Sequence, residues 1–124
     1  MHFLLVAVGG ALGAAMRHGV NLLALRWFGP AFPWGTLAVN VLGSFVMGLM
    51  VELIARKLGA SPEWRLFAAT GLLGGFTTFS AFSLDVVVLW ERGQMTMAAT
   101  YVMASVILAI AALFAGLVLG RTLV

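Results

Sequence analysis

The stretch Gly71-Leu72-Leu73-Gly74-Gly75-Phe76-Thr77-Thr78-Phe79-Ser80-Ala81-Phe82-Ser83-Leu84-Asp85 lies in the middle of a long apolar segment that runs from Trp64 to Trp90. Its three glycines and two adjacent threonines weaken a helix, through backbone entropy and competing side-chain hydrogen bonds. In lipid, a freed carbonyl needs another partner, so a break is tolerated only inside protein or beside a polar site. Broken membrane helices repeatedly use such carbonyls to hold a cation. The stretch therefore predicts a membrane helix that is broken at its middle, with an ion site beside the break.

The composition is that of an integral membrane protein. Hydrophobic residues make up 63% of the 124 residues and charged residues only 9%, whereas soluble domains carry about 25% charged residues. The chain has no room for a second folded domain, so residues 1–124 are predicted to form a single membrane domain that assembles into an oligomer. The net charge is +3, but the basic residues lie mostly at span ends, which favours membrane anchoring over nucleic-acid binding.

Four apolar segments are each long enough to cross a bilayer, because a hydrocarbon core of about 30 Å requires about 20 helical residues. They run roughly over residues 3–25, 34–54, 64–90 and 97–119. All four tryptophans fall at the predicted span ends, where aromatic belts form. We predict an all-α membrane protein with four transmembrane helices per subunit and both termini on the same side.

The basic residues give little preference for one orientation in the membrane. The side that holds the termini has four of them, and the other side has two, or three if Arg17 reaches it. Because orientation follows this difference, two interpretations stay open. The chain either inserts both ways and forms an antiparallel dimer, or it takes one orientation with the termini in the cytoplasm.

Aromatic and polar side chains gather near the break, and each has two interpretations. Phe79 and Phe82 are either packing residues or rings whose positive edges favour an anion. Asn40 either bonds a neighbouring helix or donates its amide N–H to a passing anion. Tyr101 and Ser105 are four residues apart, so they share one helix face.

Other polar groups have similar alternatives. The carbonyls of Gly74 and Thr77 either offer an ion site or belong to a kink that neighbouring helices satisfy. Arg17 is either functional or extends to the interface, and a structural Arg17–Asp85 pair is a further possibility. We expect Glu52, Glu91 and Arg121, near span ends, to contact water or headgroups. No catalytic arrangement is evident, so an enzyme is not expected.

Three segments carry a resemblance to a known family: Gly10-Ala11-Leu12-Gly13-Ala14 with Arg17; Trp34-Gly35-Thr36-Leu37 with Asn40 and Gly43-Ser44-Phe45; and Gly71 to Ser83. Together they resemble the Fluc (CrcB) family of fluoride channels, and the resemblance covers essentially the whole chain. The third segment is the most specific of them.

The resemblance implies a dual-topology antiparallel homodimer with two fluoride pores and a structural sodium ion at the dimer centre. The implied sodium ligands are the main-chain carbonyls of Gly74 and Thr77 from both subunits. The implied pore residues are Thr36, Asn40, Phe79, Phe82, Tyr101, Ser105 and, at the vestibule, Arg17. Asp85 stands where many relatives have Glu, and Ala109 stands where some have a hydroxyl.

The function that the resemblance implies is passive export of fluoride from the cytoplasm across a bacterial inner membrane, which reduces fluoride toxicity. One alternative is a small dual-topology proton-coupled multidrug exporter, which has the same size and span count. Such exporters carry an acid in their first span, where this chain has Arg17 instead. A second alternative is a structural subunit that only assembles with other membrane proteins.

Overall fold

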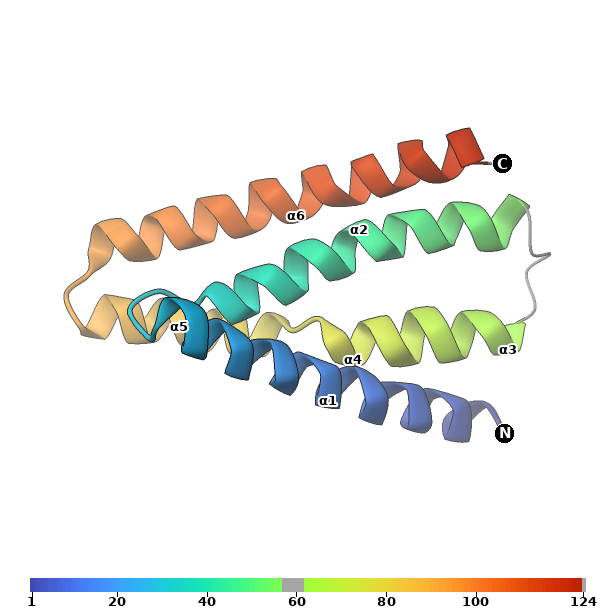
Figure 1. Ribbon diagram of the computed structural model, residues 1–124, viewed down its shortest axis with the longest axis horizontal. Coiled ribbons are helices and arrows are strands. Elements are labelled where there is room, and N and C mark those ends of the chain that lie inside the picture. Colours follow the sequence, from blue (N-terminus) through green and yellow to red (C-terminus); the bar gives the residue numbers. More distant parts are fainter. Residues whose placement is uncertain (57–61, 124) are drawn as a thin grey trace.

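The computed structural model describes residues 1–56 and 62–123 as a bundle of long helices (Figure 1). Among these residues, four helical segments have the length and hydropathy of membrane spans. Three are continuous helices: α1 (His2–Phe28), α2 (Trp34–Arg56) and α6 (Met95–Leu123). The third crossing consists of α3 (Pro62–Trp64), the π-helix η1 (Arg65–Leu73), α4 (Gly74–Phe76) and α5 (Phe79–Glu91).

Both termini lie at one end of the bundle, which we call the terminal end (Figure 1). The opposite end holds the α1–α2 and α5–α6 connections, and we call it the turn end. Gly29 begins the first connection with a φ of 78°, and Gly93 lies in the second with a φ of 76°. Both values fall in the left-handed region, which glycine adopts without steric cost. Lys57 and Gly59, predicted to lie in the connection between the second and third spans, are outside the described residues.

Glycines bring the helices close enough for their backbones to touch. A side chain at Gly48 of α2 would meet the Leu113 carbonyl and, at 3.0 Å, the Leu117 nitrogen of α6. A side chain at Gly116 would meet the Phe45 carbonyl of α2 in the same way. Small residues at such positions are the usual means of helix association in lipid. They explain why α2 and α6 run side by side (Figure 1).

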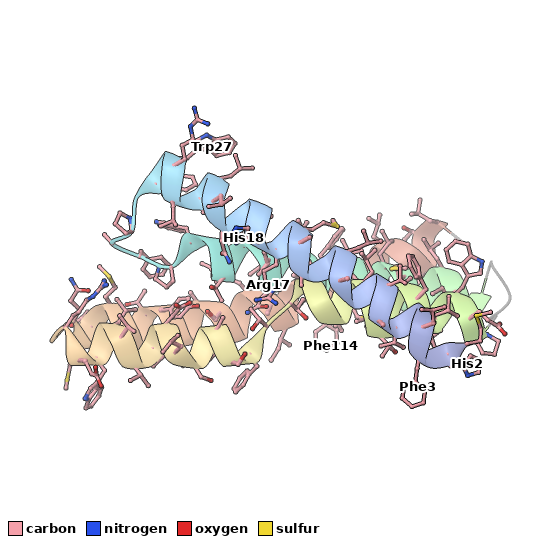
Figure 2. All side chains as sticks on the ribbon, turned by 90° about the horizontal axis from the view of Figure 1, so that it is seen from below. His2, Phe3, Arg17, His18, Trp27 and Phe114 are labelled. Carbon is pink, nitrogen blue, oxygen red and sulfur yellow. The ribbon has the colours of Figure 1, made fainter. Side chains whose placement is uncertain are left out.

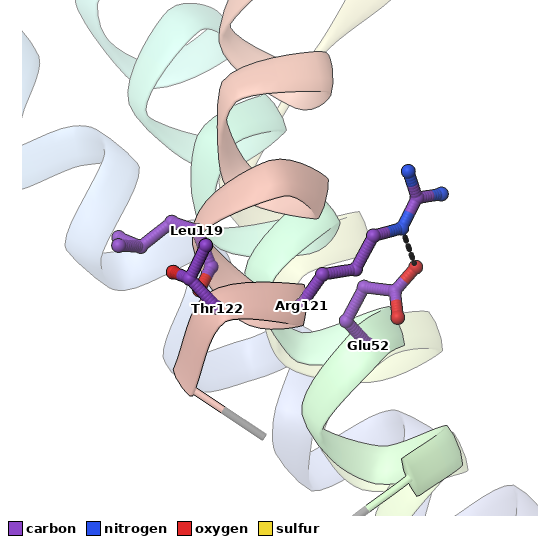
Figure 3. A network of polar contacts seen from close by, with 4 residues as sticks. All are labelled: Glu52, Leu119, Arg121 and Thr122. Carbon is purple, nitrogen blue, oxygen red and sulfur yellow. Dashed lines mark hydrogen bonds and ion pairs between the residues drawn. The ribbon is translucent and has the colours of Figure 1, made fainter.

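Glu52 does not face water or headgroups, so that prediction from the sequence is wrong for this residue, whereas Arg121 is exposed. The side chain of Glu52 is only 9% exposed, and its Oε1 accepts a hydrogen bond of 2.9 Å from the Nε of Arg121 (Figure 3). The pair links α2 to α6 near the terminal end. Gly120 makes room for it, because a side chain there would meet the Glu52 Cβ at 2.6 Å.

Little of the described chain is buried, and a small apolar cluster occupies the turn end. Its buried members come from three crossings: Leu37, Leu89, Ala98 and Tyr101. Phe32 and Phe82 pack against this cluster. Large apolar side chains such as Phe3 and Phe114 point outward (Figure 2), as expected of surfaces that face lipid or another subunit.

Candidate ion site at the broken third helix

The third crossing is unwound at two threonines. Thr77 has φ −84° and ψ 159°, and Thr78 has φ −154° and ψ 125°, so both are extended. The next helix begins at once, because the Thr78 hydroxyl accepts a bond of 3.1 Å from the Ala81 nitrogen and caps α5. The crossing is therefore broken near its middle, as the sequence predicts.

The glycines of this stretch do not cause the break by unwinding. Gly71, Gly74 and Gly75 are all within helical segments, η1 and α4. Two of them contact α1 instead: a side chain at Gly71 would meet Gly9 Cα at 3.1 Å, and one at Gly75 would meet Gly10 Cα at 2.9 Å. Their small size therefore serves packing, and the threonines carry the extended backbone.

Asn40 of α2 bonds both backbone polar groups of Thr78. Its Oδ1 accepts from the Thr78 nitrogen at 2.8 Å, and its Nδ2 donates to the Thr78 carbonyl at 2.9 Å. The carboxamide has one further N–H, and Asn40 also lines a groove beside the break. Asn40 thus makes the hydrogen bond to a neighbouring helix that the first interpretation of the sequence predicts. It also keeps one N–H, which the second interpretation would use to bind an anion.

Arg17 of α1 reaches the same region but does not pair with Asp85 in the described structure. Its Nε donates to the carbonyl of Gly75 at 3.2 Å, and Figure 2 places Arg17 at the point where α1 passes the broken helix. Asp85 accepts a hydrogen bond of 3.0 Å from the Tyr101 hydroxyl instead. The pair considered from the sequence is therefore replaced by two separate contacts.

A groove of about 450 Å³ opens beside the break, between α2, α5 and α6. It brings together five of the predicted site residues: Asn40, Thr77, Phe79, Phe82 and Ser105. Phe79 is 78% exposed, and its ring centroid lies 5.5 Å from that of Phe82. The Ser105 Oγ is buried without a hydrogen-bond partner among the described residues, so its hydroxyl donor is unused by the part of the chain that the structure describes.

Thr36 does not line this groove but lines a second cavity of about 360 Å³ at the turn end. Tyr101 lies next to this second cavity, because its hydroxyl bonds Asp85 in the cavity wall. That cavity is lined by Thr36, Asp85 and Arg92, among others. Tyr101 is completely buried, and its hydroxyl donates a hydrogen bond of 3.0 Å to Asp85 of this cavity. The ring centroids of Tyr101 and Phe82 lie 5.2 Å apart, so Tyr101 contacts Asp85 of the cavity and Phe82 of the groove.

Two aromatic residues that the sequence did not single out for the site continue this series of rings. Phe32 meets Tyr101 edge-on, with centroids 5.4 Å apart and an interplanar angle of 86°. Trp34 follows at 4.7 Å from Phe32. The sequence identified Trp34 only as an interfacial belt residue. The contact of Phe32 with Tyr101 joins residues far apart in the chain, so no local sequence pattern predicts it.

These features define a small multi-pass membrane protein with a groove at the break of its third crossing, in which a few polar side chains lie among apolar ones. Residues 4–117 match the family described as CrcB-like protein, Camphor Resistance (CrcB). The chain belongs to this family, which confirms the resemblance found in the sequence. This family membership, together with four helical segments of membrane length among the described residues, makes it a multi-pass protein of the inner membrane.

Relatives of almost the same length carry a specific functional name. The chain is 60% identical over 119 residues to the fluoride-specific ion channel FluC of Agrobacterium fabrum, covering 96% of this chain and 95% of the relative. It is 62% identical over 122 residues to the protein of the same name from a Chelativorans species, covering 98% of each. A third relative with this name, from Rhizobium etli, is 60% identical over 121 residues, with 98% of this chain and 97% of the relative covered.

Proposed function

We propose that this chain is a fluoride-selective ion channel, through which fluoride leaves the cytoplasm by passive electrodiffusion. The observation that carries the proposal is the identity of about 60% over nearly the full length with relatives named fluoride-specific ion channels. Such a protein is a channel and not an enzyme. Family membership argues against the multidrug-exporter alternative, and so does the presence of Arg17 in place of an acid in α1.

The groove supplies groups that replace the water around a small anion. The spare N–H of Asn40 and the unpartnered hydroxyl of Ser105 are donors, and the edges of Phe79 and Phe82 carry partial positive charge. None of these groups is a formal cation. Binding is therefore weak and spread over several places, which conduction requires. Thr36 and Tyr101 add further hydroxyl groups nearer the turn end. Arg17 adds a positive charge near the break.

The functional unit is an antiparallel homodimer. Gly74 is exposed in the subunit, and a side chain added there would come no closer than 3.7 Å to its neighbours within the subunit. Packing within one subunit therefore does not require glycine at this position, whereas close approach of a second copy at the break would. In a lone subunit the exposed ring of Phe79 and the open groove would also face lipid. The polar groups of the groove would then lie in lipid, which is costly. The weak charge bias of the sequence supports opposite orientations for the two copies.

A structural sodium ion fits the break. Carbonyl oxygens are suitable ligands for a hard cation, and Gly74 and Thr77 each have a carbonyl that receives no backbone hydrogen bond recorded for the described residues. The Gly74 and Thr77 carbonyls of both subunits would hold the ion. When bound, it would fix the two broken helices together and supply a positive field beside the groove.

The test is anion efflux from liposomes that contain the purified chain, with fluoride and chloride compared at matched gradients. We expect fast fluoride efflux, negligible chloride efflux and no dependence on a proton gradient. Phe82→Ala is expected to reduce the fluoride flux. The matched control is Phe3→Ala, because Phe3 is exposed at the far end of α1 (Figure 2) and does not line the groove. Well-folded dimers that release no fluoride would overturn the proposal.

A further inference from the structure

The nitrogen of Thr78 does not make the bond that a continuous helix would give it. In an α-helix each N–H bonds the carbonyl four residues earlier, so the Thr78 N–H would bond Gly74. It donates instead to the Oδ1 of Asn40 at 2.8 Å. Because the amide has only one hydrogen, the side chain of Asn40 releases the carbonyl of Gly74.

The nitrogen of Ala81 is diverted in the same way. Its partner in a continuous helix would be the carbonyl of Thr77. It donates to the Oγ1 of Thr78 at 3.1 Å, and Thr77 itself has an extended backbone. The Thr78 hydroxyl therefore releases the carbonyl of Thr77.

Carbonyls next to these two are occupied. The Leu73 carbonyl accepts from both the nitrogen and the hydroxyl of Thr77, each at 3.0 Å. The Gly75 carbonyl accepts from Arg17, and the Thr78 carbonyl accepts from Asn40. Three carbonyls of the break thus accept hydrogen bonds from side chains. Two further side-chain oxygens accept the N–H groups that would otherwise bond the carbonyls of Gly74 and Thr77.

The geometry points to Asn40 and Thr78 as positioning residues of the sodium site, which act by diverting two amides from its carbonyl ligands. This inference rests on the sodium ion of the proposed function. It gives Asn40 a role that does not depend on contact with fluoride. It also assigns a role to Thr78, which is not among the predicted site residues.

The experiment measures how sodium stabilises the purified dimer. Sodium replaces a large organic cation, N-methyl-D-glucamine, at constant ionic strength, and the midpoint of thermal dissociation of the dimer is recorded. A ligand that binds only the folded state raises this midpoint with concentration. For Asn40→Ala and for Thr78→Val, we expect the sodium concentration of half-maximal stabilisation to rise about 10- to 100-fold, as for other lost supports of metal ligands.

Conservative variants separate positioning from a general loss of stability. Thr78→Ser keeps the hydroxyl oxygen, and Asn40→Asp keeps an acceptor for the Thr78 N–H, so both are expected to retain the sodium response. Ser44→Ala changes another polar residue of the groove and is the matched control. A response in Asn40→Ala and Thr78→Val equal to that of the unsubstituted protein would overturn the inference. If sodium did not raise the midpoint of thermal dissociation of the unsubstituted dimer, the sodium site itself would be overturned, whatever the outcome of the fluoride efflux measurement.

Discussion

The carboxamide of Asn40 and the backbone of Thr78 form a two-way pair, in which each residue donates one hydrogen bond to the other. The donor–acceptor distances are 2.8 and 2.9 Å, and the pair joins α2 to the break of the third crossing. An amide is the side-chain group suited to this pairing, because it presents a donor and an acceptor side by side. Asp lacks the donor and Leu lacks both groups.

Replacement of Asn40 by Ala is expected to lower the stability of the protein by about 1–3 kcal/mol. The substitution removes both hydrogen bonds between Asn40 and the part-buried backbone of Thr78, and the loss of such bonds costs about this much. Unfolding by increasing SDS mole fraction in mixed micelles measures the loss. Asn40→Leu should be at least as harmful, so a neutral effect of both substitutions would contradict the pairing.

The second prediction concerns the glycines that let α1 approach the third crossing. Gly13→Ala is expected to destabilise the protein by about 1–3 kcal/mol, because the new Cβ would meet the Leu72 carbonyl and the Phe76 nitrogen, the latter at 2.7 Å. These are backbone atoms, so relief requires α1 to move away. The same unfolding measurement tests this expectation.

Gly19→Ala is the matched control for this prediction. It lies on the same helix, and a Cβ there has no atom within 4 Å. Because alanine favours a helix over glycine by about 1 kcal/mol, this variant is expected to be as stable as the original or more so. Equal losses at both positions would mean that close approach is not the reason for Gly13.

The sequence predicts the four crossings and the broken third helix, because hydropathy and helix-weakening residues are local signals. It does not predict how the break is made. Gly71 and Gly75 weaken helices by propensity, yet contact with α1 keeps them helical. Tertiary packing therefore overrides propensity there, and the extended backbone moves to Thr77 and Thr78.

The candidate site was predictable as a set of residue types but not as a set of partners. Asn40, Phe79 and Ser105 were singled out from the sequence, and the groove collects them. The partners of Arg17 and Asp85 depend on which helix faces which. Opposite charges make a pair between them one possibility from the sequence, whereas in the structure Arg17 contacts Gly75 and Asp85 contacts Tyr101.

The third prediction concerns the ion pair between Glu52 and Arg121. Arg121 is 52% exposed and Glu52 only 9%, so solvent screens the pair in part. A double-mutant cycle with Glu52→Gln and Arg121→Gln is expected to give a coupling energy of at most about 1 kcal/mol, which falls as salt is added. Unfolding of the four proteins at low and high salt measures it. A coupling that is independent of salt would contradict partial exposure of the pair.

The last prediction concerns Phe32, whose ring meets the Tyr101 ring edge-on at 5.4 Å. Phe32→Leu keeps an apolar side chain but removes an aromatic contact worth about 0.5–1.5 kcal/mol. The Tyr101 ring then keeps its contact with Phe82 but loses the one with Phe32, so the position of the ring beside Phe82 is less well fixed. If the chain conducts fluoride as proposed, we expect the fluoride conductance of a single channel to fall about two- to tenfold, the rate equivalent of that energy.

Single-channel recording in planar bilayers separates this role from a contribution to folding alone. Phe28→Leu is the control, since Phe28 is exposed and contacts Trp34 at the outer end of the same series, with centroids 5.6 Å apart. It is expected to leave the unitary conductance unchanged. If Phe32→Leu instead gave fewer channels of unaltered conductance, Phe32 would support only the fold. A fall in unitary conductance confined to Phe32→Leu would place the influence on conduction at the ring that touches Tyr101.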